Sequence, residues 1–385
     1  MLKILTIIGA RPQIIKAAAL SRAIRESFGD QIQELLLHTG QHYDQNMSEV
    51  FFEQLQIPRP DYNLNVGSGS HGKQTATMIS GIEEVLIKEK PDYLVVYGDT
   101  NSTLAGAIAA SKIHIPIAHI EAGLRSFNKS MPEEINRIMC DHASTLLFSP
   151  TSTGIKNLEL EGFNLANTKP FTNDKPGVFH CGDVMFDNSL HFASLADQQS
   201  NILAEYELEG EPFILSTIHR DNNTDQPERL SAIFEAICAV VEQHNLSVVL
   251  PLHPRTAKLL QKNLPKGLYQ QVIKNKKIKL LPPVSFLDMI ALEKNAQLVM
   301  TDSGGVQKEA YYFKKPCVIM RPETEWVEIV ELGAGRLVDA NTQRIIEAVN
   351  YFLNEATPTF PQIFGDGKAA EFICSILLEN RQAKS

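Results

Sequence analysis

Acidic side chains follow two apolar runs of the sequence, at positions where carboxylates could exchange protons with a ligand. Asp99 ends the run 92–99, Glu121 comes near the end of the run 115–122, and Glu133 begins the helical stretch that follows. Each has an ordinary explanation, because Asp is common at helix N-caps and Glu in first helical turns. If the two runs are neighbouring strands, however, the carboxylates share one rim. There they can shift one another's pKa values and supply both an acid and a base.

Cations and histidines in the first half could contact an anionic ligand. Arg11 in GARPQIIK offers a fixed fork of donors to phosphate or sugar oxygens, and Lys16 lies about one helical turn further on. Alternatively both are solvated surface cations, and Gln13 between them is a polar contact or a surface residue. In HTGQHYDQNM, His42 could contact a sugar, whereas His38 is closer to the strand and more typical of a near-core histidine. No acidic or histidine partner stands at metal-ligand spacing, so a metal site is not indicated.

A glycine-containing turn in the second half is typical of phosphate binding. In TDSGGVQKEA a strand ends at Thr301, and Ser303, Gly304 and Gly305 open a helix. Glycines let the backbone approach a ligand closely, and a helix N-terminus offers free N–H groups to phosphate oxygens. Glu309 lies about one turn further along, where its carboxylate could accept hydrogen bonds from a ribose diol. An ordinary strand-to-helix turn explains the same residues equally well.

Polar loops follow other apolar runs of the second half. STIHRDNNTD presents His219 and Arg220, LPLHPRT presents His253, and RPETEWVE begins with Arg321. Each loop alone could be an ordinary polar connection. Four strand ends of this half have such loops, which favours a functional explanation for the group.

Apolar runs alternate with helical stretches from end to end of the chain. The runs lack polar alternation, which is typical of parallel strands covered on both faces. Their alternation with helices predicts right-handed βαβ units. The predicted strands are 2–10, 32–40, 92–99, 115–122, 145–150, 177–184, 212–220, 246–254, 278–284, 297–305 and 317–321. The predicted helices include 11–26, a segment around 47–56, 74–89, 102–114, 132–144, 152–161, 226–243, 255–263 and 368–380.

The length and the order of these elements predict more than one domain. At roughly 150 residues per domain, 385 residues correspond to two or three. We expect an α/β protein with two Rossmann-like parallel-sheet domains, over residues 1–186 and 187–367, and a C-terminal helix 368–385 that joins the first. The segment 185–211, with its weak periodicity, is the expected crossing. Ligands bind beyond the carboxyl ends of strands in such sheets, so we expect a ligand cleft between the domains.

Composition and charge exclude several classes of protein. The hydrophobic content of 43% and charged content of 21% are those of a globular protein, and the net charge of −9 argues against a nucleic-acid-binding surface. MLKILTIIGARPQ lacks the features of a signal peptide, and no apolar stretch approaches the roughly 18 residues that span a membrane. The cysteines form no CxxC pair, which is typical of reduced thiols in a cytoplasmic protein. They are Cys140, Cys181, Cys238, Cys317 and Cys374.

The motifs, taken in order, resemble the non-hydrolysing UDP-N-acetylglucosamine 2-epimerases over essentially the whole chain. The resemblance rests on GARPQIIK, HTGQH, YGDTNST, HIEAGLRS, PEEINR, HR, TDSGG with a Glu six residues after its Ser, and R-x-x-T-E. Any one motif is a weak signal, whereas so many in the right order are highly specific. The resemblance implies a glycosyltransferase-B-like fold, a homodimer, a UDP-sugar substrate, and neither a metal nor a cofactor.

The resemblance also implies an elimination and re-addition at C2 of the sugar. UDP leaves across C1–C2, an enzyme-bound 2-acetamidoglucal forms, and UDP adds back after C2 is reprotonated on its other face. Transferred by motif, Asp99, Glu121 and Glu133 are the acid/base carboxylates, and His219 assists at the leaving group. The implied substrate and UDP contacts are Arg11, Lys16, His42, Arg220, His253, Ser303, Gly304, Gly305, Glu309 and Arg321.

The identity of the sugar stays open. RSFNKSMPEEINR and DSGGVQKEA are closer to a subgroup that includes 2-epimerases of UDP-2,3-diacetamido-2,3-dideoxy-glucuronic acid. The C6 carboxylate of that sugar would suit an extra cation such as Lys129 or Arg125. A glycosyltransferase on the same fold and a hydrolysing relative that releases N-acetylmannosamine are the alternative functions, and an allosteric UDP-sugar site is not settled. A role in making precursors for bacterial surface polysaccharide is expected from the family.

Overall fold

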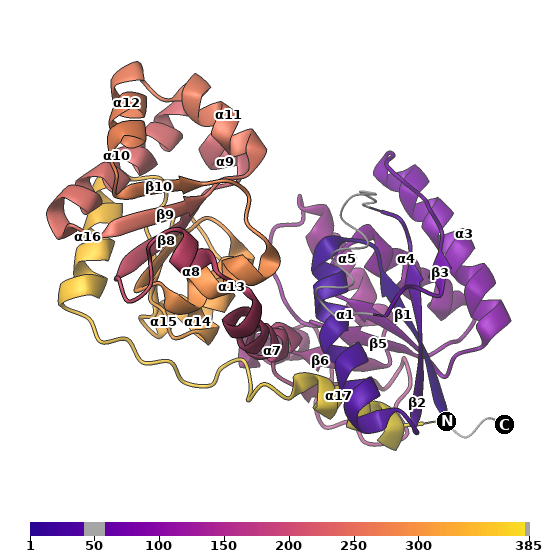
Figure 1. Ribbon diagram of the computed structural model, residues 1–385. Helices are drawn as coiled ribbons and strands as arrows, with labels where there is room; N and C mark the ends of the chain where they lie inside the picture. Colours follow the sequence, from indigo (N-terminus) through magenta and orange to yellow (C-terminus); the bar gives the residue numbers. More distant parts are fainter. Residues whose placement is uncertain (42–57, 382–385) are drawn as a thin grey trace. The chain divides into compact units, whose positions relative to one another are not determined.

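The computed structural model describes residues 1–41 and 58–381, which form two compact units (Figure 1). Unit 1 comprises Met1–Asn188 and Gln362–Ser385, and unit 2 comprises Ser189–Pro361. The helix expected around 47–56 and the candidate sugar contact His42 lie outside the described residues.

Unit 1 is built on a seven-stranded sheet in which all pairs are parallel, in the order β3-β2-β1-β4-β5-β6-β7. The order reverses between β1 and β4, and ligands of such sheets bind at the carboxyl ends beside this reversal. Strands β1, β4, β5 and β6 are almost completely buried, because helices cover both faces of the sheet. The strands are β1 Leu2–Ile8, β2 Ile32–His38, β3 Tyr62–Asn63, β4 Tyr93–Tyr97, β5 Ile117–Ile120, β6 Leu146–Ser149 and β7 Gly177–His180.

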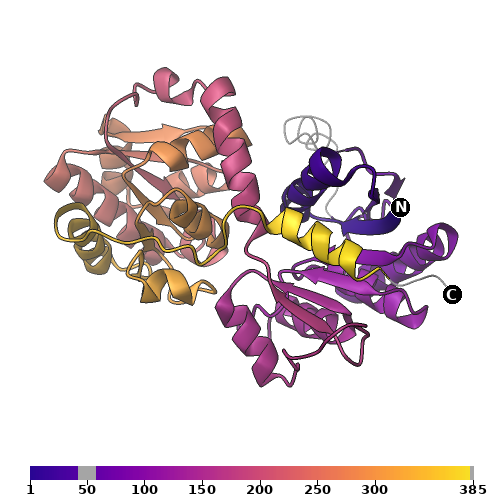
Figure 2. The same ribbon diagram turned by 90° about the horizontal axis from the view of Figure 1, so that it is seen from below.

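The helices of unit 1 include one from the far end of the chain. Helix α17 packs against α1, as the yellow helix of Figure 2 shows. The Asp187 carboxylate accepts hydrogen bonds from the N–H groups of Ala369 and Ala370, in the first turn of α17, at 3.1 and 2.8 Å. The helices are α1 Arg11–Ala23, the π-helical turn η1 Ile24–Phe28, α3 His71–Glu89, α4 Asn101–Lys112, α5 Pro132–Ala143, α6 Ser152–Leu160, α7 Val184–Gln199, which continues into unit 2, and α17 Ala369–Glu379.

Unit 2 repeats this plan with a six-stranded parallel sheet in the order β10-β9-β8-β11-β12-β13. Here the order reverses between β8 and β11. The strands are β8 Phe213–Thr217, β9 Ser247–Pro251, β10 Ile278–Leu281, β11 Leu298–Thr301, β12 Cys317–Ile319 and β13 Gly335–Leu337. The helices are α8 Ile202–Glu205, α9 Asp221–Thr224, α10 Pro227–His244, α11 Pro254–Asn263, α12 Lys266–Lys274, α13 Phe286–Asn295, α14 Gly304–Tyr312, α15 Val327–Glu331 and α16 Thr342–Asn354.

The predicted class, two parallel-sheet α/β domains, is confirmed, while several elements were not expected. The short strands β3 and β13 and helix α12 have no counterpart among the predicted elements. Most of the segment 185–211 is helical, in α7 and α8. The buried positions of α7 include the polar Asn188 and Ser189 beside Phe192 and Ala196. Polar residues at buried positions obscure the apolar period of about 3.6 residues that marks a helix in a sequence.

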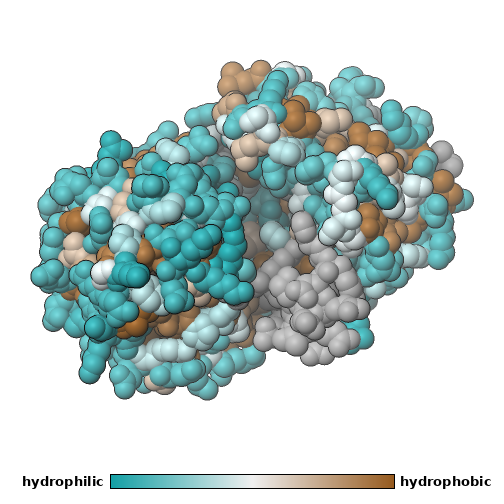
Figure 3. All heavy atoms as spheres, turned by 90° about the horizontal axis from the view of Figure 1, so that it is seen from above, coloured by the Kyte–Doolittle hydropathy of each residue, from teal (hydrophilic) through white to brown (hydrophobic). Residues whose placement is uncertain are grey.

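The surface and the thiols are those of a globular protein. On the faces visible in Figure 3 most residues are hydrophilic, and hydrophobic residues form small separate patches. All five cysteines are free thiols. Among the helices of the described residues, none has the length and apolar content to cross a membrane. Within those same residues, no group of three or more His, Cys, Asp and Glu side chains is arranged to hold a metal ion.

Candidate active site

The carboxyl ends of β4 and β5 bring Asp99 and Glu121 to neighbouring positions on the rim of unit 1. The two strands are hydrogen-bonded neighbours in the sheet. Asp99 follows β4 by two residues, and Glu121 follows β5 directly. Glu133 lies in the first turn of α5, the helix after β5.

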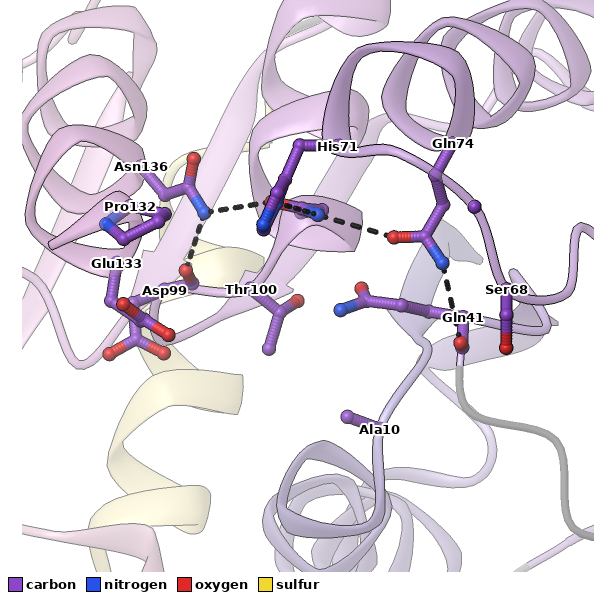
Figure 4. A pocket seen from close by; sticks show the side chains of 12 residues that line it. Ala10, Gln41, Ser68, His71, Gln74, Asp99, Thr100, Pro132, Glu133 and Asn136 are labelled. Atoms are coloured by element: carbon purple, nitrogen blue, oxygen red, sulfur yellow. Dashed lines mark hydrogen bonds between the residues drawn. The ribbon is translucent and has the colours of Figure 1, made fainter. Parts of the chain in front are cut away.

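A cavity of about 380 Å³ opens at this rim, a volume within the range of small-ligand sites. Asp99 and Glu133 line it and lie on the same side in the view of Figure 4. Both are accessible, since the Asp99 side chain is 27% exposed and Glu133 is exposed. The lining residues are Ala10, Gln41, Ser68, Gly69, His71, Gln74, Asp99, Thr100, Asn101, Pro132, Glu133 and Asn136.

Arg137 of helix α5 fixes the position of the Asp99 carboxylate beside the cavity. Its guanidinium donates through Nη2 to Asp99 and through Nη1 to Glu134 Oε2, the latter at 3.1 Å. Glu134 also accepts the backbone N–H groups of Ser126 and Phe127, each at 2.9 Å. Burial acts to raise the pKa of Glu134, but these hydrogen bonds and Arg137 hold it below its usual value. Glu134 is therefore an ionised anchor for Arg137.

Glu121 is buried and forms an ion pair with Lys16 of α1. Gly98 leaves room for this pair, since a Cβ atom there would lie 3.0 Å from Glu121 Oε2 and 3.1 Å from Lys16 Nζ. The φ angles of Gly98 and Glu121 are +61° and +73°. The left-handed conformation is ordinary for glycine but costs an L-residue such as glutamate about 1–2 kcal/mol. Such strain is common at functional sites. Lys16, the predicted phosphate contact, is here the partner of a carboxylate.

A chain of side-chain hydrogen bonds, which the sequence did not indicate, runs along the cavity from Asp99 to His71 (Figure 4). Asn136 Nδ2 donates to the Asp99 carbonyl at 2.8 Å and to Asn101 Oδ1 at 3.4 Å. Asn101 Nδ2 donates to Gln74 Oε1 at 3.2 Å and contacts His71 Nδ1 at 3.0 Å. A carbonyl can only accept, so Asn136 donates and the direction of the whole chain is fixed. His71 Nδ1 therefore accepts, and the proton of the neutral ring lies on Nε2.

The four members of this chain were missed because they stand within helices rather than at strand ends. His71 and Gln74 lie in the first turn of α3, and Asn101 begins α4. Asn136 lies one turn into α5. The available signal was an amide or imidazole close to the start of three successive helices.

In unit 2, Asp302 shapes the turn that presents His219 and Arg220 at the end of β8. Its buried carboxylate accepts the backbone N–H groups of His219 and Arg220, each at 3.1 Å. It also accepts from Asn223 Nδ2 at 3.1 Å. Burial lowers the pKa of His219, although the Asp302 carboxylate acts to raise it. The neutral imidazole is thus favoured at this turn.

Ser303, Gly304 and Gly305 form the start of helix α14, as predicted for a phosphate-binding turn. Ser303 is the N-cap, and its hydroxyl accepts the N–H of Val306 at 3.5 Å. Arg321, at the end of β12, lies beside this helix start, because a Cβ atom on Gly304 would be 3.7 Å from its Nη1. Its guanidinium binds both carboxylate oxygens of Glu325, at 2.9 and 3.0 Å. A helix N-terminus with an adjacent Arg is a favourable site for an anion.

Two further predicted contacts of unit 2, His253 and Arg220, remain to be placed. His253 caps α11 after β9, and it is close enough to His219 to act on the pKa of that residue. Burial acts to raise the pKa of Glu325, but the hydrogen bonds and charge of Arg321 and, to a smaller degree, the charge of Arg220 hold it below its usual value. Arg220 is thus near enough to Glu325 to act on it electrostatically.

Glu309 lies one and a half turns into α14 and interacts with Glu293 of α13. Glu293 is completely buried, and neither of its carboxylate oxygens meets a donor group of the protein. Burial, and next the charge of Glu309, raise the pKa of Glu293 well above its ordinary value. Burial without a donor thus favours the neutral form of the Glu293 carboxyl group, and Glu309 is close enough to act on its pKa.

One expected sugar contact is wrong. The Arg125 guanidinium is buried and donates to Asp141, to both carboxylate oxygens of Glu161 and to the Leu124 carbonyl. It has no free face for a sugar carboxylate. Lys129 is exposed but does not line the cavity. The backbone of Arg11 begins α1 beside the cavity residue Ala10.

Comparison with known proteins gives the family. The family model described as UDP-N-acetylglucosamine 2-epimerase matches residues 25–378. A UDP-N-acetylglucosamine 2-epimerase homolog of Methanococcus maripaludis is 48% identical and covers 98% of this chain and 99% of its own length. The UDP-2,3-diacetamido-2,3-dideoxy-D-glucuronate 2-epimerase of Pseudomonas aeruginosa is 49% identical over the same shares of the two chains.

A solved structure gives the same answer for the fold. The crystal structure of Methanocaldococcus jannaschii UDP-GlcNAc 2-epimerase in complex with UDP-GlcNAc and UDP is 43% identical, with a TM-score of 0.81. The match covers 98% of this chain and 100% of that one, which supports the predicted glycosyltransferase-B-like class. The chain belongs to the UDP-N-acetylglucosamine 2-epimerase family, as its motifs predicted.

Proposed function

We propose that the protein is a non-hydrolysing UDP-sugar 2-epimerase that interconverts UDP-GlcNAc and UDP-ManNAc. The observation that supports this most strongly is the pair of carboxylates, Asp99 and Glu121, at adjacent strand ends of unit 1 in a member of this family. Each is next to a cation, Arg137 and Lys16 respectively. Two carboxylates fixed in different surroundings suit a reaction that removes a proton from one face of C2 and returns it to the other.

The proposed reaction avoids direct ionisation of C2, whose hydrogen is a weak acid. A carboxylate takes the C2 proton while the C1–O bond breaks and its electron pair leaves with UDP. The product, a 2-acetamidoglucal, stays bound. UDP oxygen then attacks C1 while C2 receives a proton on its other face. Asp99, Glu121 and Glu133 are the proposed acid/base groups.

Unit 2 supplies the proposed contacts to UDP. The start of α14, from Ser303 to Gly305, would hold phosphate oxygens, and the Glu309 carboxylate would accept hydrogen bonds from the ribose hydroxyls. His219 and Arg220 would stabilise charge on the departing diphosphate. His253, Arg321, Lys16, Arg11 and His42 complete the proposed set of contacts.

A second candidate substrate is UDP-2,3-diacetamido-2,3-dideoxy-D-glucuronate, the substrate in the name of the Pseudomonas aeruginosa relative. The observation in its favour is the 49% identity to that relative, against 43% to the Methanocaldococcus jannaschii UDP-N-acetylglucosamine 2-epimerase. A side-by-side assay of the two nucleotide sugars decides between them. The preferred sugar is the one with the higher kcat/KM.

The proposal is tested by incubating the protein with UDP-GlcNAc in D₂O, with no acceptor sugar. Deuterium at C2 is expected, and its absence with both nucleotide sugars would sink the epimerase assignment. A glycosyltransferase gives no exchange. Phosphorus NMR separates the hydrolysing alternative, because net release of UDP means hydrolysis.

Asp99→Asn provides the site-specific arm of this test. The variant should lose roughly 10²–10⁴-fold in C2 exchange, the usual contribution of a general acid or base, and keep its affinity for UDP. Asp174→Asn, at an exposed position of the same unit, is the matched control and should exchange at the wild-type rate. Near-normal exchange by Asp99→Asn would remove the role proposed for Asp99.

The remaining expectations extend this proposal. We propose that the protein is a cytoplasmic homodimer that makes precursors for surface polysaccharide. The basis is the family resemblance. Light scattering of the purified protein tests the oligomeric state, and a monomer at micromolar concentration would contradict it.

A further inference from the structure

The two turns that present Asp99 and Glu121 are fastened to one buried pair of side chains, His119 and Asp141. His119 of β5 contacts the carbonyl of Gly98, the residue before Asp99, through Nε2 at 2.8 Å. The Asp141 carboxylate of α5 accepts the N–H of Gly123, two residues after Glu121, at 3.1 Å.

His119 and Asp141 are joined directly, and neither has contact with solvent. His119 Nδ1 lies 2.6 Å from Asp141 Oδ1, and both side chains are 0% exposed. Asp141 Oδ2 also accepts from Arg125 Nη2 at 2.7 Å. The pair thus connects the end of β4, the end of β5 and helix α5 behind the rim.

The partners of the ring determine its protonation. A backbone carbonyl cannot donate, so Nε2 must carry a proton to bond the Gly98 oxygen. Asp141 accepts from a guanidinium and from a backbone N–H, and a carboxylate that accepts several such bonds is ionised. Nδ1 must then carry a proton as well, because an ionised carboxylate only accepts. Both ring nitrogens of His119 are donors, and only the imidazolium has that property.

The charges around the ring are consistent with a buried cation. Cys140 and Asp141 face it from α5, and Arg125 reaches the same carboxylate from the segment after β5. Arg125 is balanced by Glu161 at the end of α6. Burial acts to lower the pKa of His119, but the Cys140 thiol and the Asp141 carboxylate raise it well above its ordinary value. With His119 charged, the net charge of the cluster is zero, because two cations, His119 and Arg125, face two anions, Asp141 and Glu161.

We propose that His119 is a permanent imidazolium and a positioning residue, which with Asp141 holds the backbone that presents Asp99 and Glu121. It does not touch the substrate. The turns need such support, because Gly98, Glu121 and Gly123 have φ angles of +61°, +73° and +80°. A left-handed glutamate is unfavourable by itself, so the hydrogen bonds on both sides of it stabilise the turn. The positioning role rests on the proposed function, whereas the charge state does not.

The charge state is tested by nitrogen NMR of the full chain labelled with ¹⁵N-histidine. At about pH 8 a histidine of ordinary pKa is neutral, whereas His119 should show two imidazolium-type nitrogens with slowly exchanging protons. His119→Gln assigns the signals by their loss. A neutral ring at that pH would overturn the proposal. This measurement does not depend on enzyme activity, so it tests the charge state of His119 even if the protein shows no C2 exchange.

The positioning role is tested by activity. In Asp141→Asn the amide oxygen must face the two donors, Gly123 N–H and Arg125 Nη2, so the amide Nδ2 donates to His119 Nδ1 and the ring becomes neutral. The imidazolium signals should disappear, whereas Nε2 still donates to Gly98 and C2 exchange should be retained. A loss of exchange as large as that of His119→Gln would overturn the positioning role.

His119→Gln and a matched control separate positioning from general instability. A glutamine amide cannot donate to Gly98 and Asp141 in opposite directions at once. The rate constant for C2 exchange should fall at least about tenfold, with KM and UDP affinity unchanged, because the turn moves while the UDP contacts of unit 2 do not. His114→Asn, at an exposed left-handed position that asparagine tolerates, should leave all three quantities unchanged. Equal loss of UDP affinity in His119→Gln would indicate a structural role only.

Discussion

Units 1 and 2 have the same kind of sheet but end their strands differently. In unit 1 the strand ends present carboxylates, Asp99 and Glu121, and cations of neighbouring helices pair with them. In unit 2 the ends of β8 and β12 present cations, Arg220 and Arg321, and a helix begins directly after Ser303. One topology thus yields a rim suited to proton transfer and a rim suited to binding an anion. The chemistry lies in the residues after each strand rather than in the fold.

The backbone differs in the same places. The turns after β4 and β5 contain left-handed residues at Gly98, Glu121 and Gly123. Residues 218–220 and 302–305, all within the described part of unit 2, contain none. Left-handed turns point a side chain where a standard turn would not, which suits a reacting carboxylate. A phosphate held by backbone N–H groups needs only a regular helix start.

Carboxylate substitutions in the two units should therefore affect different quantities, turnover in unit 1 and UDP affinity in unit 2. Glu121→Gln should lower turnover roughly 10²–10⁴-fold and leave UDP affinity unchanged, because the amide oxygen can still accept from Lys16 but the side chain can no longer take up a proton. Glu309→Ala should weaken UDP binding about tenfold through the lost charge-assisted hydrogen bonds, with a smaller effect on turnover at saturation. Calorimetric titration with UDP and the C2 exchange rate measure the two quantities. Glu159→Gln, exposed in unit 1, is the control. A loss of UDP affinity in Glu121→Gln would contradict this division.

A pair of glycine substitutions tests the backbone difference. Gly98→Ala places a methyl group about 3 Å from both members of the Glu121–Lys16 pair at a left-handed position. It should lower the melting temperature and the exchange rate but not UDP affinity. Gly304→Ala meets its nearest side-chain atom only at 3.5 Å. Its melting temperature should stay unchanged while UDP affinity falls, since the methyl group occupies the approach to the helix start. If Gly304→Ala bound UDP normally, the proposed phosphate position would be wrong.

The smallest expected effect is the pH dependence of the buried acid beside Glu309. The pKa of Glu293 is raised in the folded protein, so the folded state holds this proton more tightly than the unfolded chain. The stability that it contributes is present at low pH and is lost as the pH rises above about 4.5 toward the raised value. Glu293→Gln keeps a donor that cannot ionise. The melting temperature of the wild type relative to this variant should fall from about pH 5 to about pH 8. A constant difference would show that Glu293 does not titrate in this range.

Features that depend on strand ends could be predicted from the sequence. Polar residues directly after apolar runs located Asp99, Glu121 and the Ser303 turn, because carboxyl ends of parallel strands meet at one edge. Glu133 was predicted because it lies in the first turn of the helix that follows the strand of Glu121. These inferences use only local order along the chain and the rules of parallel sheets.

Features that depend on pairing across the fold could not be predicted. Gln13 was interpreted as a polar contact or a surface residue; it is buried, and its side chain accepts from the Gly9 N–H and donates to the Tyr97 carbonyl. Arg125 was named as a cation that would suit a sugar carboxylate, yet its partners Asp141 and Glu161 come from α5 and the end of α6. The sequence shows the types of these residues, but their partners lie far away along the chain and cannot be read from local order.

The return of the chain to unit 1 has a consequence for the order of folding. Residues 189–361 of unit 2 are continuous, whereas unit 1 needs α17, whose Ile373, Cys374 and Leu377 are fully buried. A ribosome therefore delivers every residue of unit 2 before this core helix of unit 1. Domains generally fold as units during synthesis, so unit 2 can be complete while unit 1 still lacks part of its core. A nascent chain stalled before residue 369 would expose to chaperones the apolar surface that α17 covers, and unit 1 with its rim of Asp99 and Glu121 would be completed last.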